Sequence, residues 1–157
     1  MIQETLFNIP YYTLPTLNFK VKKKQLTNLL KSYPEKKQGI QPFSTNRQSN
    51  RNGLAQGFSK ILGEELGLFS QKVKSNVHIE DIWSVSYSKG EYHSPHNGSL
   101  GWAGILYLDL PKDSPGTSYL QPWNDIQNDT SIYHPINVVE GQIVVVPQFV
   151  THFSPPN

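Results

Sequence analysis

The sequence predicts a mainly β protein with helices in its N-terminal part, folded as an antiparallel sandwich or jelly roll. From about residue 77 to residue 157, short apolar segments alternate with turns rich in Gly, Pro, Asn and Asp, which is typical of antiparallel sheets. Before residue 76, two segments carry apolar residues at helical spacing. No internal repeat divides the 157 residues, so we expect one domain, 1–157, with two or so helices covering an outer face of the sheets.

The N-terminal part contains two predicted helices. In KKKQLTNLLKSY, residues 22–33, apolar side chains recur at helical spacing until Pro34 ends the run. In NGLAQGFSKILGEELGLFSQKVK, residues 52–74, a stripe of apolar residues predicts the second helix. Four internal glycines weaken this prediction, because Gly costs about 1 kcal/mol relative to Ala inside a helix. The polar segment between the two is expected to be a loop.

The C-terminal part contains the predicted strands. The first, VHIEDIWSVSYS at residues 77–88, alternates between apolar and polar positions, as a strand with one buried face does. Four more apolar segments follow between turn residues. They are WAGILYLDL (102–110), GTSYLQPW (116–123), TSIYHPINVV (130–139) and GQIVVVP (141–147).

Composition excludes several classes of function. The chain has no cysteine, which excludes disulfides and thiolate metal sites and agrees with a reducing compartment. The formal net charge is only +2, and the lysines between residues 20 and 37 are better explained by a solvated helix face than by a nucleic-acid surface. No apolar run has membrane-spanning length and the N-terminus does not resemble a signal peptide, so we expect a cytoplasmic protein without a membrane partner.

Three histidines form the candidate site. His93 and His96 lie in GEYHSPHNGSLGW, residues 90–102, which is too rich in Gly, Ser and Pro to be a helix and which we interpret as a turn. His152 follows the apolar segment that ends at Pro147. In a jelly roll, a strand after the first turn and a strand near the end can lie side by side at one mouth of the barrel. We therefore expect the three histidines to meet there.

Imidazole is the commonest metal ligand in proteins, and two histidines with a carboxylate are typical of non-haem Fe(II) oxygenases. A single histidine on a loop is more often a solvated or capping residue, and only the combination favours a metal site. His78 and His134 lack this context: His78 begins a strand and is expected to be exposed, and His134 precedes Pro135 and is expected to be structural.

Three segments carry a family resemblance: LFNIPYYTL, IWSVSYSKGEYHSPHNGSLGWAGILYLDLP and VVEGQIVVVPQFVTHFSPPN. With these, the chain resembles the small 2-oxoglutarate/Fe(II)-dependent oxygenases of double-stranded β-helix (jelly-roll) fold, in particular a group common in tailed-phage genomes. The resemblance covers nearly the whole chain. It is most specific in YHSPHN followed by GWAGILYL, and in EGQIVVVPQFVTHFSPPN.

The resemblance implies Fe(II) and 2-oxoglutarate as cofactors, and the cytoplasm of a bacterial host as the location of a phage-encoded protein. It implies His96 and His152 as metal ligands and Tyr107, on the strand after the first histidine, as a contact to the cosubstrate. Ser154 and Gln148 flank His152 and are expected to orient it or to line the cofactor pocket.

Two departures from the family pattern leave alternatives open. The family's third ligand stands two residues after the first histidine, where this chain has Gly98, so His93 or a water would complete the metal site, or a halide would take the vacant place as in related halogenases. The family also has an Arg beyond the distal histidine that pairs with the far carboxylate of 2-oxoglutarate. The sequence ends at Asn157 before such a residue, which predicts either a truncated C-terminus lacking the last core strand or a protein that does not bind 2-oxoglutarate in the ordinary way.

Three functions remain in competition at this point. The leading hypothesis is an Fe(II)/2-oxoglutarate-dependent dioxygenase, a hydroxylase, that acts on a small-molecule cosubstrate and an unknown substrate. The second is a cupin-like protein that binds metal with three histidines and uses no 2-oxoglutarate, because GQIVVVPQFVTH approximates a cupin pattern. The third is an inactive jelly roll that serves as a structural or assembly protein of a phage, with copies of itself or virion proteins as partners.

Overall fold

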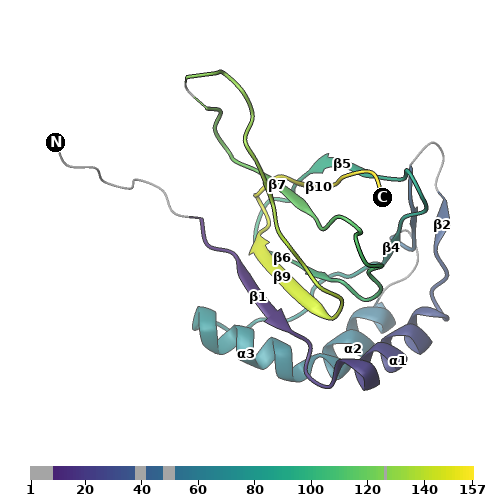
Figure 1. Cartoon of the computed structure of the whole chain (residues 1–157). Coiled ribbons are helices and arrows are strands. Elements are labelled where there is room, and N and C mark those ends of the chain that lie inside the picture. Colours follow the sequence, from purple (N-terminus) through teal and green to yellow (C-terminus); the bar gives the residue numbers. More distant parts are fainter. Residues whose placement is uncertain (1–8, 38–41, 48–51, 126) are drawn as a thin grey trace.

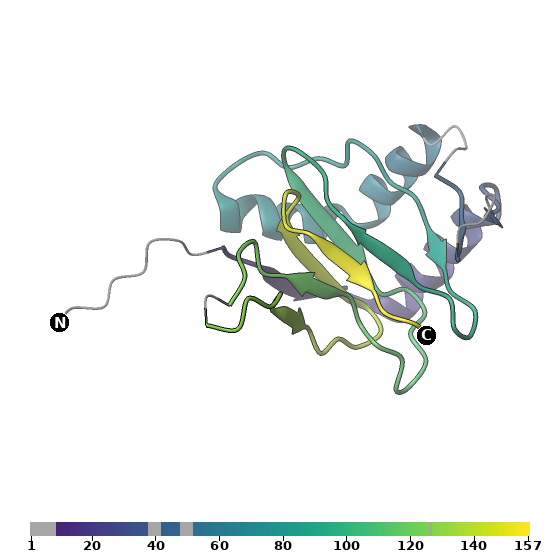
Figure 2. The same cartoon turned by 90° about the horizontal axis from the view of Figure 1, so that it is seen from above.

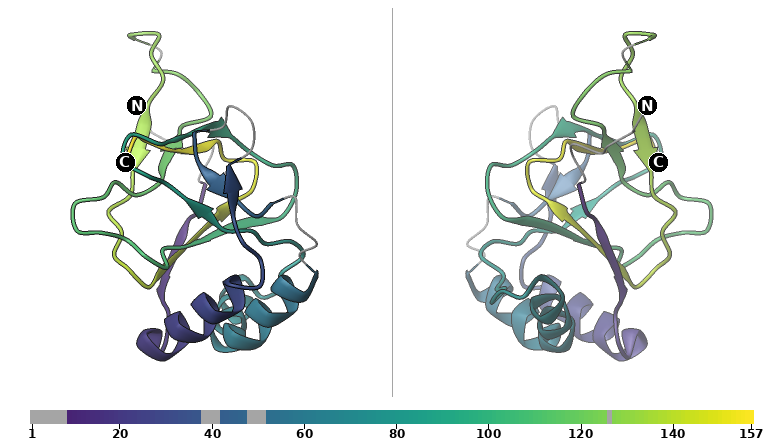
Figure 3. Two further views of the ribbon diagram at one scale, coloured as in Figure 1. Left: turned by 90° about the vertical axis from the view of Figure 1, so that its right-hand side faces the viewer. Right: turned by 90° about the vertical axis from the view of Figure 1, so that its left-hand side faces the viewer.

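The computed structural model describes residues 9–37, 42–47, 52–125 and 127–157, and places ten short strands and three helices in them. The two main antiparallel sheets lie over one another, and the helices cover the outer side of one of them (Figure 1; Figure 3). The predicted fold class, a mainly β jelly roll with helices from the N-terminal part, is confirmed. No helix in the described ranges has the length and apolar character needed to cross a membrane.

The strands form three antiparallel sheets. The sheet next to the helices has the order β1 (Tyr12–Pro15), β9 (Gln142–Pro147), β6 (Trp102–Leu106). The sheet opposite has the order β5 (His93–His96), β10 (His152–Ser154), β7 (Ser118–Leu120), β8 (Tyr133–Pro135), and Figure 2 shows its strands side by side. A small third sheet joins β2 (Lys36–Lys37), β3 (Ser44–Thr45) and β4 (Val85–Ser86).

Strand β9 shows why the apolar run IVVV is needed. Successive side chains of a strand point to opposite faces, and β9 is covered on both. Val144 and Val146 pack into the core between the two large sheets. Ile143 and Val145 face the other way and pack against Phe69 of the helical layer. Burying a Val or Ile side chain contributes roughly 1.5–3 kcal/mol, so this strand anchors the helices and the barrel at once.

The helices are α1 (Phe19–Leu30), α2 (Asn52–Ile61) and α3 (Gly63–Val73). The prediction of one helix over residues 52–74 was wrong, because the segment breaks at Leu62, whose φ of −98° and ψ of 22° leave the helical region. The break lets Leu62 stay buried in the core that α1 and α2 share. Gly57 has a packing role there, since a Cβ at this position would collide with the Leu29 side chain of α1.

Two other sequence-based expectations need correction. Most of the predicted strand over residues 77–88 is irregular, and only β4 is regular, because the chain finds a partner only where it meets β3. The region before residue 76 is not wholly helical, since β1, β2 and β3 lie in it and β1 pairs with β9. Such pairing partners are distant in the sequence, so local pattern does not reveal them.

Candidate metal centre

His93 and His96 lie on strand β5, which corrects the prediction that they lie on a turn. Residues three apart on a regular strand point to opposite faces, because side chains alternate. Here His96 pairs with His152 and His93 pairs with Ser154, so three steps along β5 match two steps along β10. The extra residue is a β-bulge, and it turns both histidines to the same face of the sheet.

A row of side chains crosses three neighbouring strands of this sheet. His152 is the cross-strand partner of His96 on one side and of Tyr119 on the other. Directly paired residues project from the same face, so the three rings lie next to one another. The ring centroids of His96 and His152 are 4.4 Å apart, and those of Tyr119 and His152 are 6.0 Å apart. The predicted meeting of the distal and proximal histidines therefore occurs in the structure.

Hydrogen bonds to the backbone orient the two facing imidazoles. His96 Nδ1 lies 2.8 Å from the carbonyl of Ser94, and His152 Nδ1 lies 2.9 Å from the carbonyl of Val150. Because a carbonyl only accepts, each Nδ1 carries the proton and donates it, which leaves the Nε2 lone pair for a ligand. Metal-binding histidines commonly have their second nitrogen fixed in this way. The donor chemistry of this pair fits a divalent metal such as Fe(II).

The third histidine is differently placed. His93 is stacked on His96, with ring centroids 4.0 Å apart and ring planes at 22°. The ring centroid of Phe43 lies 4.2 Å from that of His93. Lone pairs lie in the ring plane, so two nearly parallel imidazoles do not aim at one point. Over the described part of the chain, no group of three or more His, Cys, Asp or Glu side chains is arranged to hold a metal ion. The assignment of His93, His96 and His152 as ligands stays a prediction.

Burial keeps two of these histidines neutral. It lowers the pKa of His93 to about 4, with further lowering by the neighbouring His96, His152 and Arg47 charges. Burial also lowers the pKa of His152, with repulsion from His96 in the same direction, against the hydrogen bond to the Val150 carbonyl, which raises it. Neutral imidazole is the form that binds a metal, so both side chains are in the ligating state at neutral pH.

The two predicted cosubstrate residues are both near the core but differ in their bonding. The Tyr107 hydroxyl donates to Thr117 Oγ1 at 2.9 Å and accepts from the Thr117 N–H at 3.1 Å, so its single proton is already used in a hydrogen bond within the protein. Ser154 pairs with His93 across β5 and β10 and is hydrogen-bonded to the Tyr87 hydroxyl. Tyr87 in turn lies 3.5 Å from His93 Nδ1. The role of Tyr107 and Ser154 in binding a cosubstrate stays a prediction.

Gly98 occupies a crowded position. Its N–H donates to the Gln148 carbonyl at 2.9 Å, and a Cβ built on Gly98 would overlap the Gln148 side chain. A carboxylate two residues after His96 therefore has no room while Gln148 keeps this conformation. Glycine at position 98, where the family has its third ligand, is therefore the residue that the packing of the Gln148 side chain allows.

Sequence reasoning missed Tyr119 and the bulge. Tyr119 lies in the predicted strand 116–123, but its neighbour in space depends on the pairing of β7 with β10. Burial raises the pKa of Tyr119, and the nearby Tyr107 adds to the shift, so its hydroxyl keeps its proton. The remaining histidines stay apart from the pair: His78 is exposed, and the exposed His134 bonds to Gln121 Oε1 through Nε2 at 3.2 Å.

Solved structures share this fold. A Pseudomonas putida prolyl-4-hydroxylase aligns with 94% of this chain and 86% of its own, with a TM-score of 0.60 and 12% identity. A Trichoplax adhaerens prolyl hydroxylase, solved with a peptide of the hypoxia inducible factor oxygen degradation domain, aligns with 93% of this chain and 77% of its own, with a TM-score of 0.50 and 10% identity. The fold is that of the prolyl hydroxylases.

At this level of identity the likeness concerns the fold alone. No family model matches the chain, and no curated protein matches it. The 2-oxoglutarate/Fe(II) oxygenase fold expected from the sequence is thus supported by structural comparison, whereas nothing in the comparisons supports the narrower phage grouping.

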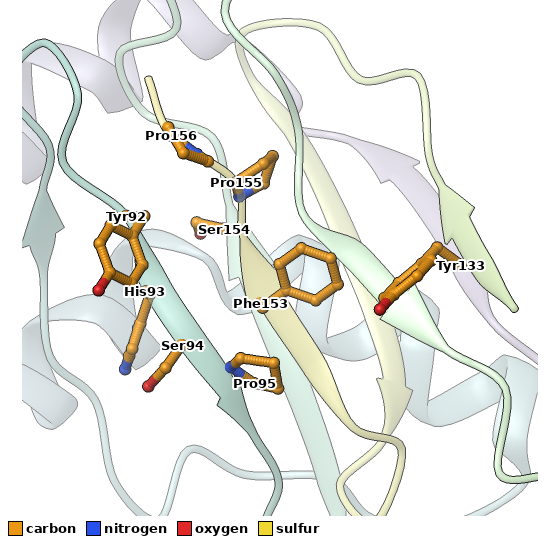
Figure 4. Close-up of a pocket in the computed structure, with 9 residues that line it drawn as sticks. All are labelled: Tyr92, His93, Ser94, Pro95, Tyr133, Phe153, Ser154, Pro155 and Pro156. Carbon is orange, nitrogen blue, oxygen red and sulfur yellow. The ribbon is translucent and has the colours of Figure 1, made fainter. Parts of the chain in front are cut away.

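A separate cavity of about 400 Å³ lies against the outer face of the β5–β10–β7–β8 sheet (Figure 4). Phe153, Tyr133 and Pro95 line it. Phe153 alternates with His152 along β10, and Tyr133 with His134 along β8, so these rings point away from the row of His96, His152 and Tyr119. The cavity is also lined by His93 and Ser154 of the candidate site, but not by His96, His152 or Tyr119.

Proposed function

We propose that this protein is an Fe(II)-dependent oxygenase that uses 2-oxoglutarate to hydroxylate an as yet unidentified substrate. One observation carries the proposal: His96 and His152, distant in the sequence, face each other across paired strands, with each Nδ1 bound to a carbonyl. The prolyl hydroxylase fold adds support, since such enzymes use this chemistry.

In this proposal the residues of the chain hold and shield the metal. His96 and His152 would bind Fe(II) through Nε2, and two imidazoles leave coordination positions open for cosubstrate and oxygen. Bound iron with 2-oxoglutarate supplies an oxidant for a C–H bond. In the balanced reaction one O₂ and one 2-oxoglutarate convert R–H to R–OH, with release of succinate and CO₂. The buried wall of Val144, Val146 and Tyr119 keeps bulk water out of the adjoining core.

The direct test is succinate release. Purified protein with Fe(II), 2-oxoglutarate and O₂ is expected to form succinate, and removal of Fe(II) or the change His152→Ala is expected to abolish it. The exposed His78 provides the matched control, so His78→Ala should retain the activity. Absence of succinate from wild-type protein that has bound iron contradicts the proposal.

A second candidate, a metal protein with three histidine ligands and no 2-oxoglutarate, is favoured by the bulge that brings His93 beside His96. It requires His93 to turn out of its stack. Loss of metal binding in His93→Ala as large as that in His96→Ala would favour this candidate. Purified protein without any bound metal would instead favour the structural or assembly role, with copies of the chain or virion proteins as partners.

A further inference from the structure

Aromatic contacts connect the candidate metal centre with the small sheet of β2, β3 and β4. Phe43, just before β3, lies against His93, with ring centroids 4.2 Å apart. Phe43 also lies beside Tyr87, just after β4, with ring centroids 6.1 Å apart. The Pro42 carbonyl accepts the Tyr92 N–H at 3.1 Å, immediately before β5. The small sheet therefore adjoins the end of β5 that carries His93.

Arg47 lies at the other end of this small sheet. Thr45 on β3 pairs with Val85 on β4. The same antiparallel register, continued by two residues, sets Arg47 opposite Trp83. In agreement, the guanidinium carbon of Arg47 lies 4.6 Å from the centroid of the Trp83 ring. Side chains two apart along an extended chain share a face, so Arg47 lies on the face of the small sheet that meets His93.

The backbone at Arg47 is fixed by its neighbours. Asn46 is only 1% exposed, and its Nδ2 donates to the Tyr33 carbonyl at 3.0 Å. Its Oδ1 accepts the Ser84 N–H at 2.9 Å, and the Arg47 N–H donates to Thr45 Oγ1 at 3.2 Å. A cation on a fixed backbone suits recognition of a ligand, because less conformational freedom is lost on binding.

The guanidinium of Arg47 is oriented but not neutralised. Stacking on Trp83 holds the plane of the group and leaves its N–H donors at the edge for a ligand. Arg47 is exposed, and it takes part in none of the ion pairs between described residues, whereas Lys37 is paired with Glu91. The Arg47 charge reaches the candidate site, since it adds to the effects of burial and of the two other histidines that lower the pKa of His93.

The location and the charge of Arg47 indicate what it would bind. A cosubstrate on the metal adjoins the buried core, whereas Arg47 is exposed, so the group that reaches it belongs to the substrate. The chain from Phe43 to Arg47 spans roughly 13 Å if extended, which requires an elongated molecule. One free cation matches the single charge of a carboxylate, whereas a phosphate monoester carries nearly two.

We propose that Arg47 binds the carboxylate of an elongated acid whose other end reaches the metal at His96 and His152. The inference rests on the proposed function and deepens it by naming the substrate class. Two parallel N–H groups of the guanidinium match the two carboxylate oxygens. Trp83 and Tyr87, both partly buried, would contact the apolar middle of the molecule. The C–H bond that is hydroxylated then lies far from the acid group.

The test uses octanoate as a probe, with protein that is loaded with Mn(II) and saturated with 2-oxoglutarate, where no turnover occurs. Paramagnetic Mn(II) relaxes nearby protons most strongly, so NMR relaxation of octanoate reports which of its ends lies nearer the metal. We expect the terminal methyl protons to relax faster than the C2 protons. Octanamide, which has the same length and no charge, should bind about 10-fold more weakly.

Matched variants isolate the contribution of Arg47. Arg47→Gln should lower octanoate affinity about 10-fold and leave octanamide affinity unchanged. Arg47→Lys should lose less, because it keeps the charge but not the planar pair of donors. Lys112→Gln removes the same charge from an exposed residue after β6 and should change neither affinity. Calorimetry should give the same Mn(II) and 2-oxoglutarate affinities in all variants as in wild type.

Each adverse result has a defined meaning. Wild type that binds no octanoate, equal octanoate affinity in Arg47→Gln and wild type, or C2 protons that relax fastest overturns the Arg47 assignment alone. A fall in 2-oxoglutarate affinity in Arg47→Gln also overturns it, because Arg47 would then hold the cosubstrate. Wild type that binds no Mn(II), or Mn(II)-loaded wild type that binds no 2-oxoglutarate, overturns the proposed function together with it.

Discussion

A buried ion pair holds the helical layer together, and replacing its lysine should be costly. Lys22 of α1 donates to both carboxylate oxygens of Glu65 on α3, at 3.0 and 2.9 Å, and contacts Glu64 Oε2 at 2.7 Å. Glu65 also accepts the Leu17 N–H at 2.7 Å, which fixes the chain between β1 and α1. The side chains of Lys22 and Glu65 are 10% and 2% exposed, whereas that of Glu64 is 61% exposed.

These exposures set the expected magnitudes. Lys22→Met keeps the aliphatic stem but leaves Glu65 as a buried carboxylate with only the Leu17 N–H, and breaking a buried pair in this way costs about 3–5 kcal/mol. Glu64→Gln removes an exposed partner and should cost less than about 1 kcal/mol. Adding Glu65→Gln to Lys22→Met removes the unpaired charge, so the double variant should be more stable than Lys22→Met alone. Against a typical total of about 5–15 kcal/mol, the first change is large.

The assay is urea unfolding followed by circular dichroism at several pH values. Burial lowers the pKa of Lys22, but its hydrogen bonds and charge interactions with Glu64 and Glu65 outweigh this and raise the pKa overall. The stabilisation that such a lysine contributes is fully present at pH values below its pKa in the unfolded chain, about 10.5. It is lost as the pH rises through the higher pKa that the lysine has in the folded protein. The advantage of wild type over Lys22→Met should therefore persist at neutral pH and shrink above about pH 10.5. A loss below about 1 kcal/mol for Lys22→Met, or one no larger than that of Glu64→Gln, would refute the reasoning.

Two further predictions concern the neighbourhood of the candidate site. The Lys37 ammonium and then the Ser88 N–H lower the pKa of Glu91, so its stabilising effect is present above the unfolded pKa and is lost as pH falls through the folded one. Thermal midpoints of wild type and Glu91→Gln should therefore differ at about pH 6 and converge near about pH 3; a constant difference would contradict this. Gly98→Asp alone should not strengthen Fe(II) binding, because Gln148 fills the space, whereas Gly98→Asp with Gln148→Ala should strengthen it. Calorimetric titration of Fe(II) into both variants tests this, with Gln148→Ala as the control. Stronger Fe(II) binding in Gly98→Asp alone would contradict the packing argument.

The sequence was most informative where local pattern and burial coincide. The run from Ile143 to Val146 predicted a buried strand, and β9 is covered on both faces. The helical spacing that ends before Pro34 predicted α1 to within a few residues. In both cases the signal is the periodicity of apolar residues, which depends only on neighbours along the chain.

Features that depend on strand register were not predictable. The turn-like residues between His93 and His96 hid a strand, because the bulge exists only in relation to β10. The position of Tyr119 beside His152 follows from the same kind of pairing. At Leu62, an apolar stripe continuous in sequence divides into two helices because each packs separately. The meeting of His96 and His152 was expected only through the fold class and the family resemblance.

The central claim is that His96 and His152 bind one iron together, and anaerobic titration of Fe(II) into purified protein tests it most directly. We predict one tightly bound Fe(II) per chain in wild type and in the exposed-histidine control His78→Ala, and loss of tight binding in both His96→Ala and His152→Ala. A wild-type protein that binds no Fe(II), or single variants at His96 and His152 that bind it as wild type does, would contradict the account.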